Sequence, residues 1–255
     1  MFIQGQLSIL RIALSLRNSA HVLAEPNFFI VGAPKCGTTS LFYYLVQHPK
    51  VYDPKFKEPH FLCEDFPKIR ILTDQAEYDA LFEGAADGYL ATGESSVSYM
   101  YSDVARKRIR AEYPDARIIV CLRNPVDMLH SWHSQCLMTM NEDIKDFREA
   151  WAMQEKRAAG QSIPKTCLAT FSLQYRWVGS LGLHVRKLFD EFGRENVHLV
   201  FSEELRSNPS KVYGEVLEFL GLPPFDDVIF REMNANRETR VKLLAYFTER
   251  SVGYN

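Results

Sequence analysis

The sequence lacks the features that mark several specialised classes of protein. Its five cysteines are odd in number and widely spaced, without a CxxC pair, which argues against a disulfide framework and against structural zinc. There is no excess of charge of one sign, because 30 Lys and Arg face 32 Asp and Glu, for a net charge of −2. This balance argues against a broad surface for nucleic acid or an anionic membrane. The pattern predicts a globular protein of a reducing, cytoplasmic compartment.

Long hydrophobic runs are also missing. The longest apolar run, residues 7–16, is interrupted by Arg11 and is too short to span a bilayer. Residues 1–6 carry no Lys or Arg, so the start does not match a secretory signal peptide. We therefore expect residues 1–25 to form an N-terminal helical extension and residues 26–255 to form a single domain.

What the sequence does contain is an alternation of short apolar runs with longer helical patterns. Hydrophobic residues make up 46% of the chain and charged residues 24%, the ordinary range for globular proteins. Three runs read as strands buried on both faces, at residues 27–32, 117–122 and 196–202. This alternation predicts an α/β fold, a P-loop-like three-layer domain with a mostly parallel central sheet and helices on both faces.

The remaining elements follow from periodicity and from cap residues. Helices are expected at residues 38–48, 76–82, 103–113, 146–159, 173–192, 209–220 and 236–254, and a short strand at 89–93. Ser102 is placed to cap one helix at its N-terminus, and Gly221 is placed to end another. Gly179 and Gly182 weaken the prediction for 173–192.

The turn after the first strand has the composition of a phosphate-binding loop. Gly32 and Gly37 bracket a tight turn, and a helix then begins with Thr38, Thr39 and Ser40. N–H groups and hydroxyls at a helix start converge on an anion. The Walker A motif is not matched, because that motif needs Lys directly after its second glycine, and here the lysine is Lys35. A capped Gly/Pro turn without a ligand is the alternative.

A second anion site is predicted at the end of the strand at 117–122. Arg123 follows that strand, Pro125 stands where the first turn of a new helix tolerates proline, and Ser131 lies in that helix. Carboxyl ends of parallel strands share one edge of a sheet, where ligands of open α/β sheets bind. Both loops are therefore expected to face one ligand.

Three segments, in this order, resemble the sulfotransferases that use 3′-phosphoadenosine 5′-phosphosulfate (PAPS). Residues 26–41 (PNFFIVGAPKCGTTSL) resemble their 5′-phosphosulfate loop, and residues 117–131 resemble their 3′-phosphate motif. Residues 57–61 (KEPHF) resemble a segment of the carbohydrate branch, which is related to the heparan sulfotransferases. A looser match covers residues 201–222.

The resemblance implies a role for each matching residue. Lys35 would stabilise charge on the leaving phosphate as the sulfuryl group departs, and Arg123 and Ser131 would bind the 3′-phosphate. The nucleotide-binding set that it implies is Lys35, Cys36, Gly37, Thr38, Thr39, Ser40, Arg123 and Ser131. PAPS is the implied donor, and no metal is implied.

On the acceptor side the resemblance points to Glu58 as the general base, with His60 in reserve. Lys57 would contact the sulfonate or shield Glu58. The segment GESSVSY at residues 93–99 resembles an acceptor-binding stretch, so Glu94 and Tyr99 are acceptor candidates; the alternative is a polar turn with Tyr99 in the core. The acceptor is expected to be a carbohydrate or small molecule, sulfated on a hydroxyl or amine.

The C-terminus departs from the family pattern. Members generally continue with a basic, glycine-containing loop over the nucleotide, which residues 223–255 do not match, although Arg237, Arg240 and Lys242 are candidates to replace it. Two alternatives to an enzyme of this family stay open at this point. One is a P-loop nucleotide kinase or NTPase, and the other is a non-catalytic protein that binds the nucleotide without the closing loop.

Overall fold

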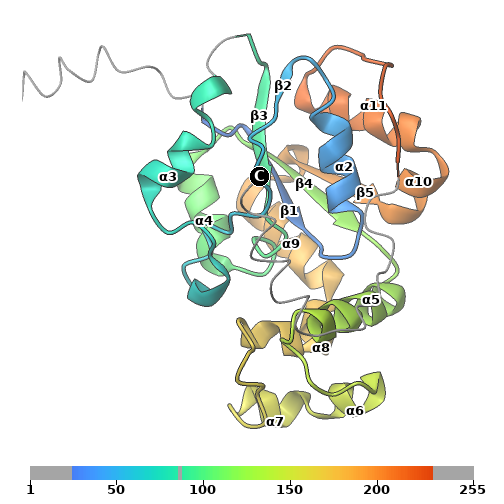
Figure 1. Ribbon diagram of the computed structural model, residues 1–255. Helices are drawn as coiled ribbons and strands as arrows, with labels where there is room; N and C mark the ends of the chain where they lie inside the picture. Colours follow the sequence, from blue (N-terminus) through green and yellow to red (C-terminus); the bar gives the residue numbers. More distant parts are fainter. Residues whose placement is uncertain (1–24, 86–87, 232–255) are drawn as a thin grey trace, which may run out of the picture.

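The computed structural model describes residues 25–85 and 88–231, and its centre is a parallel five-stranded sheet (Figure 1). The strands lie in the order β2-β3-β1-β4-β5, and all four pairings are parallel. They are β1 (Phe28–Gly32), β2 (Val51–Tyr52), β3 (Ala91–Ser95), β4 (Arg117–Leu122) and β5 (Val197–Phe201). The predicted α/β class with a mostly parallel sheet is confirmed.

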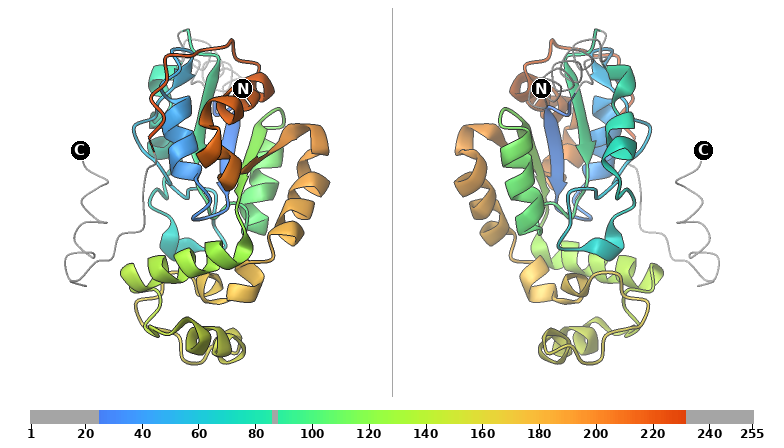
Figure 2. Two further views of the ribbon diagram at one scale, coloured as in Figure 1. Left: turned by 90° about the vertical axis from the view of Figure 1, so that its right-hand side faces the viewer. Right: turned by 90° about the vertical axis from the view of Figure 1, so that its left-hand side faces the viewer.

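Helices cover both faces of this sheet, and a group of short helices lies beyond its carboxyl edge. The α-helices are α2 (Thr38–Leu45), α3 (Gln75–Ala80), α4 (Asp103–Glu112), α5 (Pro125–Met138), α6 (Phe147–Ala152), α7 (Gln154–Ala158), α8 (Tyr175–Val178), α9 (Leu181–Phe192), α10 (Ser202–Ser207) and α11 (Pro209–Leu220). Short 3₁₀ turns occupy Pro67–Ile69, Glu83–Ala85, Thr170–Leu173 and Arg194–Asn196. Helices α2 and α11 pack on one face, and α4 and α9 on the other (Figure 2).

The core is densest where β1 runs between β3 and β4. All five residues of β1 are buried, as its apolar sequence predicts for a strand covered on both faces. Phe28 pairs with Gly93 of β3, and a Cβ at Gly93 would lie 2.4 Å from the Phe28 carbonyl oxygen. Only glycine fits this close approach, so the register of the two strands is fixed there.

The topology predicts a ligand-binding crevice between the ends of β1 and β4. The chain leaves β1 through α2 on one face and returns to β2 and β3, and it later leaves β4 toward β5 through α9 on the opposite face (Figures 1 and 2). Connections that diverge in this way open a ligand-binding crevice at the carboxyl ends of the two strands. The two predicted anion loops are the segments that follow these strands.

Several predicted boundaries are correct and others move for physical reasons. Ser102 caps α4 through its Oγ, and Gly221 ends α11 in the left-handed conformation with φ 69°, both as predicted. Strand β3, predicted from residue 89, begins at Ala91. Gly93 packs directly against Phe28, whereas Tyr89 and Leu90 stay exposed.

Three predicted helices are shorter or divided. The pattern at 146–159 splits into α6 and α7 at Met153. The pattern at 173–192 breaks near Gly179, where a Cβ would lie 2.8 Å from Leu129, so the chain turns there before α9. Helix α2 ends at Leu45, and His48 instead bonds the Pro223 carbonyl oxygen at 3.0 Å. The predicted helix at 236–254, most of the N-terminal extension, and Arg237, Arg240 and Lys242 lie outside the described residues.

Candidate active site

The loop after β1 leads directly into the N-terminus of α2. Gly37 is the N-terminal flanking residue of this helix, with φ 91°, and no side chain caps the first turn. Lys35 also has a left-handed backbone, with φ 63°. The Ala33 N–H donates to the Cys121 carbonyl oxygen at 2.7 Å, which ties the loop to β4. First-turn N–H groups without a side-chain acceptor form an anion site at a helix start.

Lys35 lies among other charged groups at this edge of the sheet. Partial burial lowers the pKa of the Lys35 ammonium, Glu58 raises it in part, and Arg123 lowers it further. The three groups come from the loop after β1, the loop before α3 and the end of β4. The structure therefore brings together Lys35, Glu58 and Arg123, which lie far apart in the sequence.

The loop after β1 and the first turn of α2 contain three buried side chains, those of Cys36, Thr38 and Ser40. Cys36 is fully buried, and burial raises the pKa of its thiol to about 12. A thiol with so high a pKa stays protonated at neutral pH, so Cys36 fits the role of a small packing residue rather than a nucleophile. Thr38 and Ser40 are also buried, whereas Thr39 is partly exposed.

The end of β4 supplies a second cation and the wall of a cavity. Asn124 caps α5 by accepting from the Val126 N–H at 3.0 Å, and Pro125 fills the first helical position as predicted. Arg123 is partly exposed and forms no ion pair within the described part of the chain. Beside it opens a cavity of about 720 Å³. The lining residues are Leu122, Arg123, Asn124, Pro125, Gly179, Ser180, Leu181, Gly182, Leu183, Phe201 and Glu203.

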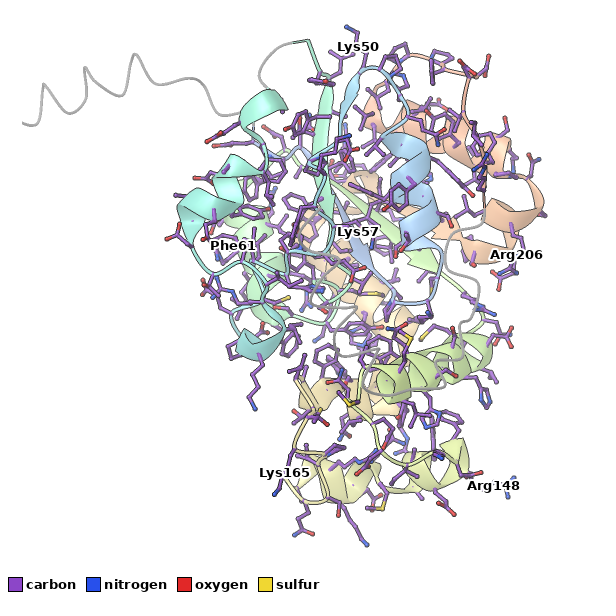
Figure 3. The ribbon with its side chains drawn as sticks, in the orientation of Figure 1. Lys50, Lys57, Phe61, Arg148, Lys165 and Arg206 are labelled. Atoms are coloured by element: carbon purple, nitrogen blue, oxygen red, sulfur yellow. The ribbon has the colours of Figure 1, made fainter. Side chains whose placement is uncertain are left out.

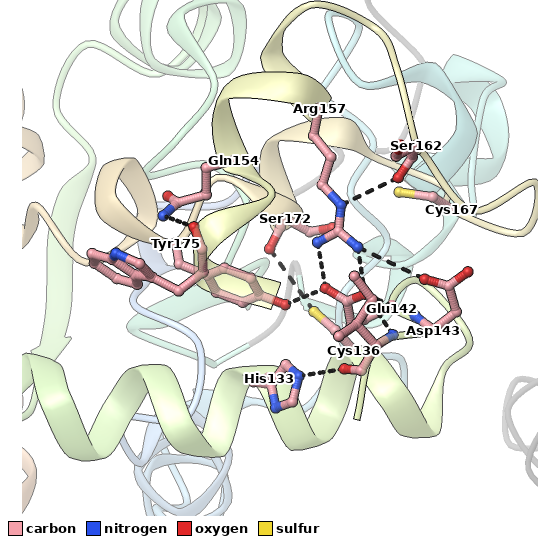
Figure 4. A network of polar contacts seen from close by, with 12 residues as sticks. His133, Cys136, Glu142, Asp143, Gln154, Arg157, Ser162, Cys167, Ser172 and Tyr175 are labelled. Atoms are coloured by element: carbon pink, nitrogen blue, oxygen red, sulfur yellow. Dashed lines mark hydrogen bonds and ion pairs between the residues drawn. The ribbon is translucent and has the colours of Figure 1, made fainter. Parts of the chain in front are cut away.

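A buried ion pair holds the chain that follows helix α5, the helix that carries Ser131 (Figure 4). Arg157 donates to both carboxylate oxygens of Glu142, at 2.5 and 2.6 Å, and the Tyr175 hydroxyl donates to Glu142 at 2.7 Å. Burial alone would raise the pKa of Glu142, but Arg157, the Ile144 N–H and Tyr175 outweigh it and lower the value to about 2. The charged pair thus fixes the chain directly after α5.

The loop before α3 is held in an uncommon backbone conformation. Lys55, Glu58 and His60 all have positive φ, at 57°, 61° and 49°. Each such residue costs about 1–2 kcal/mol, so tertiary contacts must hold the loop. The His60 N–H donates to Ser96 Oγ at 3.1 Å, one contact of the loop with the turn after β3.

Glu58 carries its charge between Lys57 and His60. Burial alone would raise the pKa of Glu58, but Lys57, which pairs with Oε1, and His60, whose Nε2 lies 3.7 Å from Oε2, hold it well below its usual range. The side chain of Glu58 is still 35% exposed. In Figure 3, the Lys57 label lies near the centre of the view. Glu58 is therefore an accessible carboxylate at neutral pH.

Glu94 and Tyr99 lie behind this loop rather than in an open cleft. Glu94 is 1% exposed and Tyr99 is fully buried, with its hydroxyl oxygen accepting from the Leu62 N–H at 3.2 Å. Burial raises the pKa of Glu94 to about 8, although Tyr99 and Ser96 partly lower it. The two residues contact the loop from within, and a contact with an acceptor stays a prediction.

One residue of the site was not found from the sequence. Lys35 Nζ donates to Gln135 Oε1 of α5 at 3.3 Å. Gln135 lies four residues after Ser131, one helical turn away, so the helical pattern already placed both on one face. A lone glutamine carries no recognisable motif, which is why the sequence did not mark it.

The described residues contain neither a membrane-spanning helix nor a cluster of metal ligands. Within 25–85 and 88–231, no helix is both long and apolar enough to cross a membrane. In those same segments, no three side chains of His, Cys, Asp or Glu gather as a metal site would require. All five cysteines are free and buried.

Comparison with known proteins identifies the family. The chain is 28% identical over 216 residues to mouse bifunctional heparan sulfate N-deacetylase/N-sulfotransferase 4, covering 78% of this chain and 22% of that protein. It is 27% identical over 257 residues to human carbohydrate sulfotransferase 15, covering 79% and 45%. The chain thus spans about a fifth to under half of these relatives.

One solved structure matches this chain over most of the length of both proteins. The crystal structure of a sulfotransferase from Alicyclobacillus acidocaldarius is 35% identical, with a TM-score of 0.70, and the match covers 89% of this chain and 92% of that one. The family model described as the sulfotransferase domain matches residues 25–247. The resemblance found in the phosphate loops is confirmed, and the chain belongs to the sulfotransferase domain family.

Proposed function

We propose that this protein transfers a sulfuryl group from PAPS to a hydroxyl or amine of a carbohydrate or small-molecule acceptor. The observation that carries the proposal is that the charges of Glu58 and Arg123 both act on Lys35, in the loop that leads into the N-terminus of α2. A kinase-like alternative lacks support, because the Walker lysine is missing from the loop. The free cysteines fit the expected reducing compartment.

The donor half of the site matches the charge of PAPS. First-turn N–H groups of α2 and the hydroxyls of Thr38 and Thr39 would hold the 5′-phosphate. Arg123, together with Ser131 on α5, would hold the 3′-phosphate, and the open hollow of about 720 Å³ that Arg123 lines would take an adjoining part of the nucleotide. These contacts would separate PAPS from ATP, which has no 3′-phosphate.

Each bond change has a side chain to assist it. The S–O bond to the 5′-phosphate breaks, and a new S–O or S–N bond forms to the acceptor. Lys35 would stabilise the charge left on the phosphate, and Glu58 would take the acceptor proton. The products are the sulfated acceptor and adenosine 3′,5′-bisphosphate.

A carbohydrate acceptor is the form of this proposal that the relatives support best. Two relatives are named for heparan sulfate and carbohydrate sulfation. In this chain the KEPHF loop, which contains Glu58, would form the acceptor side of the site, with Lys57 and His60 next to the carboxylate. Lys57 would meet the sulfonate as the sulfuryl group passes between donor and acceptor.

Thermal unfolding in the presence of nucleotides tests the donor. Adenosine 3′,5′-bisphosphate at a hundred times its Kd should add about 2.7 kcal/mol to the free energy of unfolding. For a chain of this length that is a rise in Tm of roughly 5–10 °C. ATP with magnesium should give a much smaller rise. A rise with ATP and magnesium alone would overturn the proposal in favour of a kinase, and bisphosphate binding without sulfation of any acceptor would favour a binding protein.

Arg123→Ala should weaken recognition of the 3′-phosphate specifically. Loss of a charge-assisted hydrogen bond costs about 1.5–3 kcal/mol, so the Kd for adenosine 3′,5′-bisphosphate should rise by about tenfold to a hundredfold. The Kd for adenosine 5′-monophosphate should change little. Arg148→Ala, at an exposed position of α6, is the matched control. Equal weakening for both nucleotides would place Arg123 outside the 3′-phosphate site.

A further inference from the structure

Gln135 joins the two halves of the donor site through Lys35. Its Oε1 accepts from Lys35 Nζ at 3.3 Å across 100 residues of sequence. No other hydrogen bond from this ammonium is found within the described part of the chain. The direction of the Lys35 side chain is therefore set by a residue of α5.

The identity of the acceptor atom follows from the chemistry of lysine. An ammonium group only donates hydrogen bonds, so the carbonyl oxygen of Gln135 must face it and the amide nitrogen must face elsewhere. A carbonyl oxygen stabilises the ammonium without neutralising it. A carboxylate at this place would form an ion pair and compete with any phosphate that Lys35 has to meet.

The support beneath Gln135 is rigid. Helix α5 buries Cys136 on its other side, and the chain after the helix is fixed by the Glu142 ion pair (Figure 4). Gln135 itself is only half-buried, and Ser131 lies one turn before it. Helix α5 thus carries both Ser131, whose hydroxyl is predicted to bind the 3′-phosphate, and Gln135, which accepts the hydrogen bond of the Lys35 ammonium.

We propose that Gln135 is a positioning residue, which holds the Lys35 ammonium charged and directed toward the space between the α2 N-terminus and α5. This inference rests on the proposed function for Lys35. It adds a second role for α5, beyond binding of the 3′-phosphate. The charged groups that also face Lys35, Glu58 from the loop before α3 and Arg123 from the end of β4, stay unchanged in the test below.

Two substitutions at Gln135 should move the pKa of Lys35 in opposite directions. Gln135→Leu removes an acceptor from the ammonium and lowers the pKa of Lys35. Gln135→Glu adds a negative charge and raises it. The measurement is the rate of labelling of the Lys35 amine against pH, followed by mass spectrometry on the full chain without nucleotide. A residue that only supported the fold would not move these two curves in opposite directions.

Turnover should fall in both variants, by about tenfold in kcat. In Gln135→Leu the Lys35 ammonium has lost the residue that directs it, and in Gln135→Glu the new carboxylate holds it. The Kd for adenosine 3′,5′-bisphosphate should stay within about threefold for Gln135→Leu, since the Gln135 side chain acts through Lys35 and does not itself bind the nucleotide. Gln161→Leu and Gln161→Glu repeat both changes at an exposed position and should leave every value unchanged.

The outcomes separate this inference from the proposed function. Unmoved labelling curves, or turnover within twofold of the unmodified protein in both variants, would overturn the role of Gln135. Failure of the unmodified protein to bind the bisphosphate or to sulfate an acceptor would overturn the proposed function, whatever the labelling curves show. Opposite shifts together with the loss of turnover support the positioning role.

Discussion

Glu58→Gln should lose most of its turnover while it continues to bind adenosine 3′,5′-bisphosphate. A positioned general base contributes about 10²–10⁴ in rate, and glutamine cannot accept the acceptor's proton. The substitution keeps the size of the side chain, and its left-handed backbone is unaltered. Because Glu58 lies on the acceptor side of the site, the Kd for the bisphosphate should stay close to that of the unmodified protein. Steady-state rates and nucleotide titration together measure the two effects.

Glu64→Gln is the matched control for this prediction. Glu64 is an exposed carboxylate of the same region, paired with Arg108 at 2.9 Å, and should be dispensable. His60→Gln distinguishes the reserve base, because it should cost less than Glu58→Gln if Glu58 takes the proton. Normal turnover by Glu58→Gln would remove Glu58 from the reaction.

The pH dependence of the unmodified protein follows from the charges around Glu58. Lys57 and His60 hold the pKa of Glu58 below its usual range, so the base stays ionised as the pH falls through the ordinary glutamate range. A low pKa also makes a weaker proton acceptor. When the donor is bound, movement of Lys57 onto the sulfonate would remove one cation from Glu58 and strengthen the base.

The sequence was informative where local chemistry fixes local structure. Gly32, Gly37 and the run at Thr38 defined the loop and the start of α2, and Pro125 defined the start of α5. The apolar strands β1 and β4 were predictable because burial on both faces leaves an unbroken hydrophobic run. Their parallel pairing then placed Lys35 and Arg123 at one edge of the sheet.

Other features depend on contacts between distant residues and left no local signal. The positive φ of Glu58 and His60 is held by tertiary contacts such as that between the His60 N–H and Ser96, 36 residues away. The burial of Glu94 follows from packing behind that loop, and a polar GESSVSY segment gave no sign of it. Gln135 meets Lys35 across 100 residues of sequence. Such long-range pairs require the fold before they can be recognised.

Glu142→Gln should destabilise the fold by about 3–5 kcal/mol, because the buried Arg157 guanidinium loses its bidentate, fully buried partner and keeps only the exposed Asp143, 3.7 Å away. Both side chains of the pair are fully buried, so water cannot replace the lost partner. For this chain length the expected fall in Tm is roughly 6–20 °C, measured by thermal unfolding. The far side of α5 would lose its support, so the turnover that depends on Ser131 and Gln135 should fall as well.

Removal of the whole pair should cost much less than removal of one partner. In Glu142→Leu combined with Arg157→Met, no buried charge is left unpaired, and the double variant should recover most of the stability lost by Glu142→Gln. Tyr175→Phe removes only one hydrogen bond and should cost about 1 kcal/mol.

The pKa of Glu142 is lowered to about 2, so its stabilising effect is complete above the ordinary glutamate pKa. The effect is lost as the pH falls from the ordinary glutamate pKa through about 2. Acid sensitivity that is the same in the unmodified protein and in the double variant would show that this pair does not control low-pH unfolding.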